Sequence, residues 1–432
     1  MRPSLFFLFF FLIATTFAQQ PVGIFQYNQD IGHPKKAGAG SYDEKTQVYT
    51  INGAGSNIWF NRDEFHYLYN KVKGDFILTA DFEFTGDLSR ANSHRKIGWM
   101  VRESEDEGAA SWNAVNHYDG LCLLQWRPYK GMWMRDPEEE IFAPKKGAQT
   151  IQMQRIGSVL TMKIAHPGEP LQVVASRLME MKPEVLVGLY ICSHDSDVVA
   201  QARIWNVRID QPLVNSYSSN PYVVKTPVRD VLGSRLEILD ISSGNRKIIY
   251  ESKGRFGSPY WMPDGKKLVF NEGGALYSIE VTGGNPVMLN KGSVVENKNN
   301  HPSIKEDNRD SSEYSPDRKY LYYNTNISGT MQVWRMKPGG SGKEQLTFDE
   351  YHNWFPHISP DGNMMVFISF PADIDPKEHP SYKDVMLKVM KLNAPGAPRV
   401  VAYLYGGEGT ININSWSPDS KRIAFVSNSI KY

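Results

Sequence analysis

Hydrophobic and polar residues alternate along most of the first half of the chain. Between Phe76 and Phe84, every second residue is apolar. Because successive side chains of a β-strand point to opposite faces, this period of two predicts a strand with one buried face. Comparable runs are TQVYTINGAG, KIGWMVRES, GLCLLQWRP, TIQMQRIGSVLTMKIA, EVLVGLYICS and ARIWNVRI. Together they predict an antiparallel β-sandwich over residues 19–210.

The pattern changes from about Gly233, where a repeat begins. Its copies are SPYWMPDGKKLVFNE (258–272), SSEYSPDRKYLYYNT (311–325), WFPHISPDGNMMVFIS (354–369) and INSWSPDSKRIAFVS (413–427). In each, Pro-Asp precedes a polar pair and then an alternating apolar run. Pro presets the first position of a turn, Asp can accept from its own backbone, and Gly or a small polar residue completes the turn. Each copy therefore predicts a β-hairpin.

The spacing of these hairpins predicts a β-propeller. Three copies continue into a second hairpin, and four strands make one blade. The fourth copy ends after its inner pair of strands, while residues 234–251 have the pattern of an outer pair and lack a preceding Pro-Asp hairpin. We therefore predict that the first and last segments of residues 233–432 pair with each other, and we count four blades. Residues 211–232 contain Pro, Ser and Asn and predict a linker between the two domains.

The beginning of the chain and its charge restrict where the protein acts. Residues 1–18 contain one basic residue and an apolar run from Leu5 to Ile13, which is typical of a secretory signal peptide cleaved after Ala18. The run is shorter than the ~20 residues that span a bilayer. The net charge of +1 gives no electrostatic footprint for nucleic acid. We expect a periplasmic or secreted protein that does not span a membrane and does not bind nucleic acid.

Two cysteines occur in the whole chain, Cys122 and Cys192. An oxidising compartment would permit a disulfide between them. Lone cysteines are also commonly buried as small hydrophobic residues. The sequence leaves both alternatives open, because pairing depends on geometry.

The repeat resembles that of TolB-type propellers, exported proteins often labelled as periplasmic components of a biopolymer transport system. The resemblance is carried by EYSPDRKYLYYNTNISGTMQVWRMKPGGSGKEQLTFDEYHNWFPHISPDG and YLYGGEGTININSWSPDSKRIAFVS. The segments GAGSNIWFNRDEFHYLYNKVKGDFILTADFEF and KIGWMVRES resemble a concanavalin A-like, laminin G-like sandwich. TolB-type propellers have six blades, so the resemblance implies that about two blades are lost near residues 301–310. The ring would then close with four blades or stay open.

Polar and aromatic residues gather just before the Pro-Asp turns, near the predicted central channel of the propeller. Convergent polar groups on a rigid scaffold are typical of binding sites, so we predict a ligand site at the channel mouth. Its candidate residues are His301, Glu313, Tyr314, His352, Asn353, Trp354, His357, Asn414 and Trp416. The alternative is that these residues cap strands and fill the funnel.

A second candidate ligand site lies in the sandwich, where aromatic and acidic residues are dense. Aromatic faces stack on the CH-rich faces of sugars, and carboxylates accept hydrogen bonds from hydroxyl groups. The candidate residues are Trp59, Asp63, His66, Tyr67, Trp99, Arg102 and Trp126. The alternative is that most of these aromatic residues belong to the core.

Catalytic motifs are weak in this sequence. His301, His352, His357 and His379 lie on different repeats without a compact metal-binding spacing, and no nucleophile elbow, P-loop or dinucleotide fingerprint is present. We predict no catalytic residue, metal or cofactor. We expect an exported, non-catalytic protein that binds a glycan or an envelope protein partner. The alternatives are a carbohydrate-active enzyme, either a metal-dependent oligosaccharide lyase or a glycoside hydrolase, and a purely structural scaffold.

Overall fold

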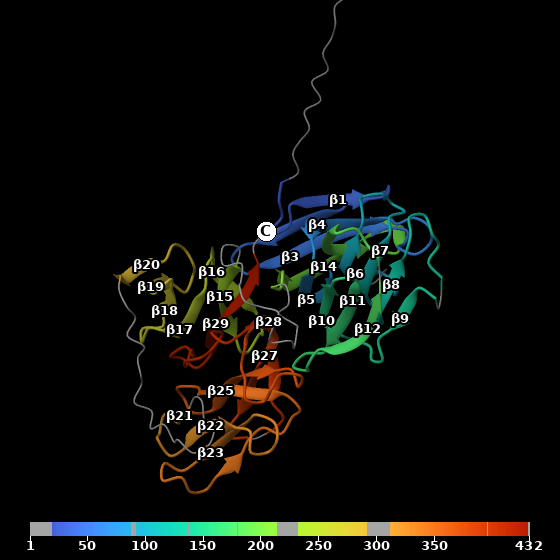
Figure 1. Ribbon diagram of the computed structural model, residues 1–432. Coiled ribbons are helices and arrows are strands. Elements are labelled where there is room, and N and C mark those ends of the chain that lie inside the picture. Colours follow the sequence, from blue (N-terminus) through green and yellow to red (C-terminus); the bar gives the residue numbers. More distant parts are fainter. Residues whose placement is uncertain are drawn as a thin grey trace, which may run out of the picture.

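A computed structural model describes residues 20–87, 92–135, 138–178, 180–213, 232–291, 312–394 and 396–430. The regular secondary structure in these ranges consists of β-strands, which confirms the predicted all-β class. Figure 1 shows two bodies side by side, with strands β1–β14 in one and β15–β29 in the other. The predicted signal peptide, residues 214–231 of the predicted linker, and the segment 301–310 lie outside the described residues.

The first body consists of two seven-stranded antiparallel sheets. One contains, in spatial order, β1 (Tyr27–Ile31), β4 (Phe65–Lys73), β13 (Glu184–Cys192), β6 (Lys96–Arg102), β7 (Ser111–His117), β8 (Cys122–Arg127) and β9 (Glu140–Phe142). The other contains β12 (Gln172–Leu178), β11 (Val159–Ala165), β10 (Thr150–Ile156), β5 (Phe76–Thr85), β14 (Asp195–Asp210), β3 (Val48–Gly55) and β2 (Ala39–Asp43). Leu78 and Ala80 of β5 and Trp99 of β6 meet in one hydrophobic core between the sheets.

The second body consists of four smaller antiparallel sheets. The first contains β16 (Arg246–Lys253), β15 (Leu232–Asp240) and β29 (Arg422–Ile430). The next contains β17 (Phe256–Trp261), β18 (Lys267–Glu272), β19 (Ala275–Glu280) and β20 (Val287–Lys291). The last two contain β21 (Ser312–Tyr314), β22 (Leu321–Thr325), β23 (Gln332–Met336) and β24 (Glu344–Gln345), and β25 (His352–Ile358), β26 (Met364–Phe370), β27 (Ser381–Lys391) and β28 (Arg399–Gly407).

The pairing of β15 with β29 joins the beginning and the end of this body. The two strands pair from Leu232 opposite Ile430 to Asp240 opposite Arg422, so the predicted pairing of the first and last segments is confirmed. The number of blades in the complete propeller stays a prediction, because residues 292–311, between β20 and β21, lie outside the described residues.

The Pro-Asp segments form the tight turns that their sequence predicts. In each copy, one backbone N–H donates to the carbonyl oxygen of the residue three positions earlier, at 2.8–2.9 Å. The pairs are Gly265 to Met262, Arg318 to Ser315, Gly362 to Ser359 and Ser420 to Ser417. All four donors have a positive φ, including Arg318 (57°) and Ser420 (60°). Because the turn requires a positive φ at this position, Gly is favoured there. Other residues are tolerated where pairing of the flanking strands stabilises the hairpin.

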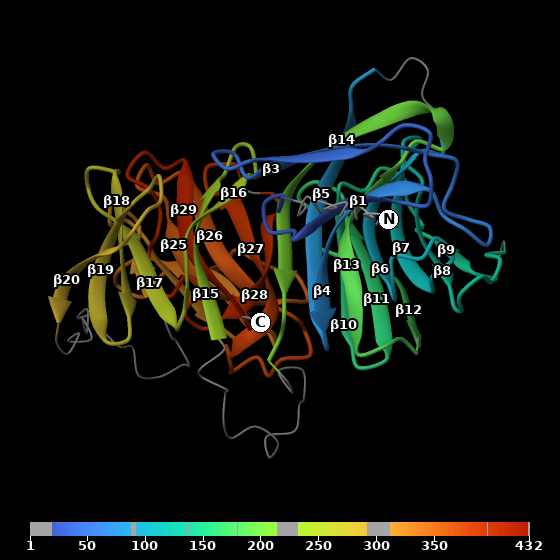
Figure 2. The ribbon, with the colours of Figure 1, turned by 90° about the horizontal axis from the view of Figure 1, so that it is seen from above.

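The two bodies are joined by buried charged residues. Arg208 of β14 donates to Glu237 of β15 at 2.6 Å, and Arg246 of β16 donates to the same carboxylate at 3.0 and 3.1 Å. Burial alone would raise the pKa of Glu237, but Arg208 and Arg246 hold this pKa well below its usual range. Figure 2 shows β16 beside β3 at this boundary. We call Arg208, Glu237 and Arg246 the interdomain lock.

Candidate functional site

The structure brings four of the predicted channel residues together, from β21, β25 and the segment before β29. His357 Nδ1 lies 2.7 Å from Glu313 Oε2, and His357 Nε2 lies 2.6 Å from the carbonyl oxygen of Ile411. Asn414 donates to Glu313 at 2.6 Å, and the indole N–H of Trp416 donates to the carbonyl of His357 at 3.0 Å. Both nitrogens of His357 are therefore engaged within the protein.

Three further channel residues, His352, Asn353 and Trp354, are buried at the start of β25. Asn353 accepts a hydrogen bond from Ser369 at 2.5 Å, and Trp354 belongs to a core cluster. Tyr314 is half-buried. The structure thus places these side chains in strand packing, and a ligand-binding role for them stays a prediction. His301 lies outside the described residues.

The sandwich residues predicted as a second ligand site lie at several depths. Trp99 belongs to the core between the sheets, and Tyr67 is fully buried on the opposite face of its sheet. His66 is also buried and lies 2.8 Å from Asp30. Trp126 is half-buried. These four side chains therefore do not form one open groove.

Asp63 and Arg102, in contrast, meet in a fully buried ion-pair cluster that also contains Arg127. Arg127 donates to both carboxylate oxygens of Asp63 at 2.7 Å, and Arg102 donates to Asp63 Oδ2 at 3.1 Å. We call these three residues the clamp. Arg127 was not predicted, although its period-two position in the run GLCLLQWRP places it on the same face as Gln125.

The clamp fixes the loops that lie over the outer face of the first sheet. Arg127 donates to the backbone carbonyls of Phe60 at 2.9 Å and of Met132 at 3.1 Å. Arg102 donates to the backbone carbonyl of Asp106 at 2.5 Å. Guanidinium groups carry five N–H donors in a rigid fork, so one buried arginine can hold several carbonyls at once. The buried clamp thus holds three loop segments by hydrogen bonds, namely 59–63, 104–109 and 129–134.

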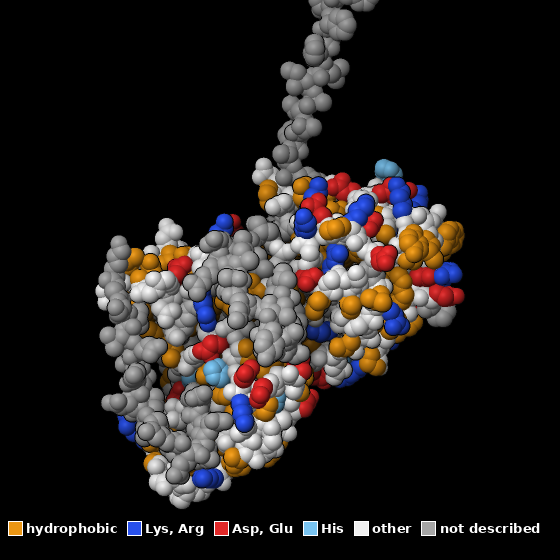
Figure 3. Space-filling view, in the orientation of Figure 1, with side chains coloured by type: hydrophobic (Ala, Val, Ile, Leu, Met, Phe, Trp, Pro, Cys, Tyr) orange, Lys and Arg blue, Asp and Glu red, His pale blue; other side chains and the backbone are white. Residues whose placement is uncertain are grey.

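Two of these loops carry an exposed pair of aromatic rings. Phe60 is 47% exposed and Trp133 is 57% exposed, and their ring centroids lie 5.2 Å apart at an interplanar angle of 65°. Tyr129, in the same loop as Trp133, is 74% exposed. We call Phe60 and Trp133 the aromatic platform. The space-filling view shows hydrophobic side chains gathered on the edge of the sandwich remote from the propeller (Figure 3).

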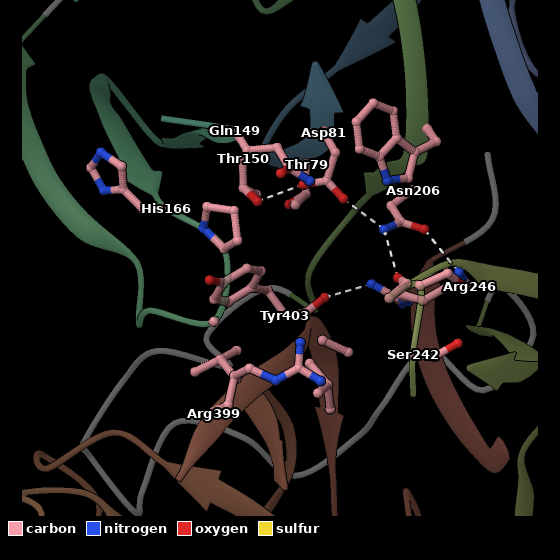
Figure 4. Close-up of a pocket in the computed structure, with 18 residues that line it drawn as sticks. Thr79, Asp81, Gln149, Thr150, His166, Asn206, Ser242, Arg246, Arg399 and Tyr403 are labelled. Carbon is pink, nitrogen blue, oxygen red and sulfur yellow. Dashed lines mark hydrogen bonds between the residues drawn. The ribbon is translucent and has the colours of Figure 1, made fainter. Parts of the chain in front are cut away.

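A cavity of about 270 Å³ lies at the boundary between the two bodies, and we call it the junction pocket. Side chains from both bodies line it, including Asp81, Thr150, Asn206, Arg246 and Arg399 (Figure 4). Thr150 and Asn206 donate to Asp81 at 2.5 and 2.6 Å. Burial raises the pKa of Asp81 despite these hydrogen bonds. No sequence pattern pointed to this pocket, because its residues are dispersed from β5 to β28.

Both cysteines are free and buried. Cys122 lies in β8 and Cys192 in β13, with β6 and β7 between these strands. At a strand spacing of about 4.8 Å, this separation is beyond the reach of a disulfide. Burial raises the pKa of Cys122 to about 12 and that of Cys192 to about 11, so neither thiol is a ready nucleophile.

Neither a metal cluster nor a membrane span is found in the part of the chain that the structure describes. There, no group of three or more His, Cys, Asp or Glu side chains is arranged to hold a metal ion. Within the same ranges, no helical segment has the length and hydropathy of a membrane span.

Residues 230–392 match the family model of the TolB beta propeller domain, so this part of the chain contains a TolB-type β-propeller domain. An uncharacterized protein of Agrobacterium fabrum is 35% identical over 170 residues, which are 38% of this chain and 53% of that relative. The chain therefore spans about half the length of this curated relative.

Two solved structures are similar to parts of this chain. One is assigned as a TolB of Agrobacterium tumefaciens, with 26% identity, a TM-score of 0.41, and coverage of 46% of this chain and 98% of that chain. The other is the exoplasmic/lumenal domain of VIP36, with 9% identity, a TM-score of 0.25, and coverage of 42% of this chain and 88% of that chain.

Proposed function

We propose that this protein is an exported, non-catalytic binding protein that recognises a glycan through the aromatic platform. The observation that supports this proposal most strongly is the exposed pair of Phe60 and Trp133 on loops held by the buried clamp. Sugar rings present CH-rich faces, which stack on exposed indole and phenyl rings. Export is expected from residues 1–18, whose sequence is typical of a signal peptide.

The fixed backbone of the platform favours ligand recognition over accidental exposure. An exposed aromatic ring on a mobile loop loses conformational freedom when it binds, and this loss weakens affinity. Here the backbone carbonyl of Phe60 accepts from Arg127 at 2.9 Å, and Met134 N–H donates to the carbonyl of Trp59 at 3.3 Å. These contacts hold the two loops together before any ligand arrives.

Charged side chains that could bind sugar hydroxyls lie close to the platform residues along the chain. Arg62 is exposed two residues after Phe60, and it pairs with Glu64 at 3.0 Å. Lys130 is exposed in the loop of Trp133 and pairs with Asp106 at 2.6 Å. Charged donors and acceptors at the rim of an aromatic surface supply orientation, while the rings supply contact area. This combination suits a polyhydroxylated ligand.

A glycan-array screen of the chain from Gln19 onwards tests the proposal. The wild type should bind at least one glycan, and binding should survive EDTA because the platform contains no metal ligand. Trp133→Ala should abolish or strongly reduce the signal. Phe348→Ala is the matched control, because it removes an aromatic ring that is 76% exposed in the propeller.

Three results would reject glycan recognition by the platform. The first is a wild type that binds no glycan, which would direct the search to an envelope protein partner by pull-down. The second is equal binding by the wild type and Trp133→Ala. The third is loss of binding on chelation, which would indicate a metal-dependent site.

A further inference from the structure

The junction pocket is built from both bodies. From the sandwich it receives Asp81 of β5, Gln149 before β10, and Trp205 of β14. From the propeller it receives Arg246 of β16 and Arg399 of β28 (Figure 4). A ligand in this cavity would contact both bodies at once, whereas a ligand on the aromatic platform would contact only the sandwich.

Asn206 holds one wall of the pocket in place. The register of β14 against β5 shifts between Trp205 and Arg208, and Asn206 has a positive φ of 53° at this irregularity. Its side-chain N–H groups donate to Asp81 at 2.6 Å and to the carbonyl of Gly244 at 3.2 Å, and its oxygen accepts from Arg246 N–H at 3.0 Å. The side-chain amide of Asn206 therefore connects the sandwich to the propeller at the wall of the pocket.

The loop after β11 holds the opposite wall. The carbonyl of Gly168 accepts from Val400 N–H at 2.9 Å, and the hydroxyl of Tyr403 donates to the carbonyl of Glu169. Gly168 has a φ of +83°, and a Cβ there would lie 2.5 Å from Cγ of Arg399. The glycine thus makes room for the aliphatic part of Arg399, which lies against this loop.

Two arginines line the pocket, but they differ in how many of their N–H donors already take part in hydrogen bonds within the protein. Arg246 donates to both oxygens of Glu237 and, at 2.7 Å, to the carbonyl of Tyr403. Arg399 makes one hydrogen bond with the described residues, to the carbonyl of Ile241 at 3.0 Å. Because a guanidinium has five N–H donors, Arg399 retains donors for a ligand. The backbone of Gln149 pairs with Ala165 and Phe82, whereas its side-chain amide makes no hydrogen bond with another described residue.

The charged residues and the volume of the junction pocket restrict the class of ligand that it can bind. Arg246 shares the carboxylate of Glu237 with Arg208 and also donates to the carbonyl of Tyr403, so Arg399 is the guanidinium with more N–H donors left for an anion. Guanidinium groups bind carboxylates through two parallel hydrogen bonds. The cavity of about 270 Å³ lies just below the ~300–1,000 Å³ of sites for drug-sized ligands, which favours a small molecule. Gln149 and Thr79 can pair with hydroxyl groups, and Trp205 offers a ring face.

We propose that the junction pocket binds a small carboxylate that carries hydroxyl groups, of the size of one sugar acid. Arg399 pairs with the carboxylate, and Gln149 and Trp205 contact the hydroxylated ring. This site is separate from the aromatic platform and does not depend on glycan recognition there.

Isothermal titration calorimetry of the chain from Gln19 onwards with D-glucuronate tests the site, with D-glucose and inorganic phosphate as comparison ligands. We expect saturable one-to-one binding of glucuronate and at least about tenfold weaker binding of glucose, because loss of a charge-assisted hydrogen bond typically costs that much. Arg399→Ala should weaken glucuronate binding by about tenfold or more. Arg399 is exposed, so this variant should retain the fold.

Two control variants make the result specific. Arg335→Ala removes an arginine that pairs with the exposed Glu344 in another sheet of the propeller, and it should bind glucuronate like the wild type. Trp133→Ala should also bind it like the wild type, even if all binding to the glycan array is lost.

The proposal is wrong if wild-type protein shows no saturable binding of glucuronate, or if Arg399→Ala binds it as tightly as the wild type. Tighter binding of phosphate than of glucuronate would identify an oxyanion site without sugar selectivity and would equally overturn the assignment. Loss of glucuronate binding in Trp133→Ala would move the site to the aromatic platform.

Discussion

At the scale of single residues, buried polar side chains contribute much of the specific structure. His117 lies in β7 with its Nδ1 atom 3.3 Å from Nδ1 of His94, and it is almost fully buried. Burial, reinforced by the positive charges of Lys96 and His94, lowers the pKa of His117 to about 3. The folded protein therefore holds this imidazole neutral over a wide range of acidic pH.

This lowered pKa predicts loss of stability in acid. An unfolded histidine binds a proton below about pH 6.5, whereas folded His117 does not until about pH 3. The unfolded state therefore binds more protons in this window, and the free energy of unfolding should fall by up to about 1.4 kcal/mol per pH unit through this group. Urea unfolding at pH 7 and pH 4.5 should show a smaller difference for His117→Gln than for the wild type.

His33, which is exposed, provides the control for this experiment. His33→Gln should keep the full pH dependence of the wild type. An unchanged difference between the two pH values in His117→Gln would show that this side chain is not held neutral by the fold. His194, whose pKa burial lowers to about 4, acts with the same sign and should leave part of the dependence in place.

At the scale of strands and loops, the clamp connects a buried ion pair to an exposed surface. Replacing Arg127 with Met keeps a long side chain but leaves Asp63 with only Arg102 as its ionic partner. Breaking a fully buried pair typically costs about 3–5 kcal/mol. Arg127→Met should lower the free energy of unfolding by this amount and increase amide hydrogen exchange in segments 59–63 and 129–134.

The same variant should weaken glycan binding although both platform rings remain. Arg203→Met is the control, because Arg203 pairs with Glu83 on the surface, where both side chains are about half exposed. Such a surface pair contributes at most about 1 kcal/mol. Native hydrogen exchange in both loops of Arg127→Met would contradict the role assigned to the clamp.

Strands and turns could be predicted from the sequence because their signals are local. The alternation between Phe76 and Phe84 sets the buried face of β5, and each Pro-Asp pair forms its turn within a few residues. The candidate sites depend on distant contacts. Trp99 and Asp63 were both expected at a ligand site, but one packs in the core and the other lies in the clamp. The local pattern of hydrophobic and polar residues does not distinguish a core position or a buried ion pair from a ligand site.

Asp81 also shows that burial caused by distant residues cannot be predicted from a local pattern. In an alternating strand with one buried face, Asp81 is expected to face solvent. It is buried instead, together with Thr79 on the same face of β5, at the boundary with the propeller. Because this burial depends on residues more than 100 positions away, such as Asn206 and Arg246, no pattern within β5 could reveal it.

At the scale of the whole molecule, the interdomain lock predicts that the two bodies unfold together. Glu237 accepts from Arg208 of one body and Arg246 of the other, and all three side chains are buried. The wild type should show a single calorimetric transition. Glu237→Gln removes the charge and should cost about 3–5 kcal/mol, which should separate the unfolding of the two bodies into two transitions.

A pair on the surface of the propeller provides the control for the lock. Glu280 pairs with Lys267 at 3.3 Å, and both side chains are about half exposed. Glu280→Gln should keep the single transition of the wild type. Two resolved transitions in the wild type itself would show that the bodies are not coupled by the lock.

The most direct test of glycan recognition is the dissociation constant of the strongest array glycan for the wild type and for Trp133→Ala, measured by calorimetry in the same buffer. Loss of an indole ring from the centre of a contact surface typically costs at least about 2 kcal/mol, so the constant should rise about thirtyfold or more. Phe348→Ala should leave it unchanged. Equal dissociation constants for the wild type and Trp133→Ala would contradict the platform as the site of recognition.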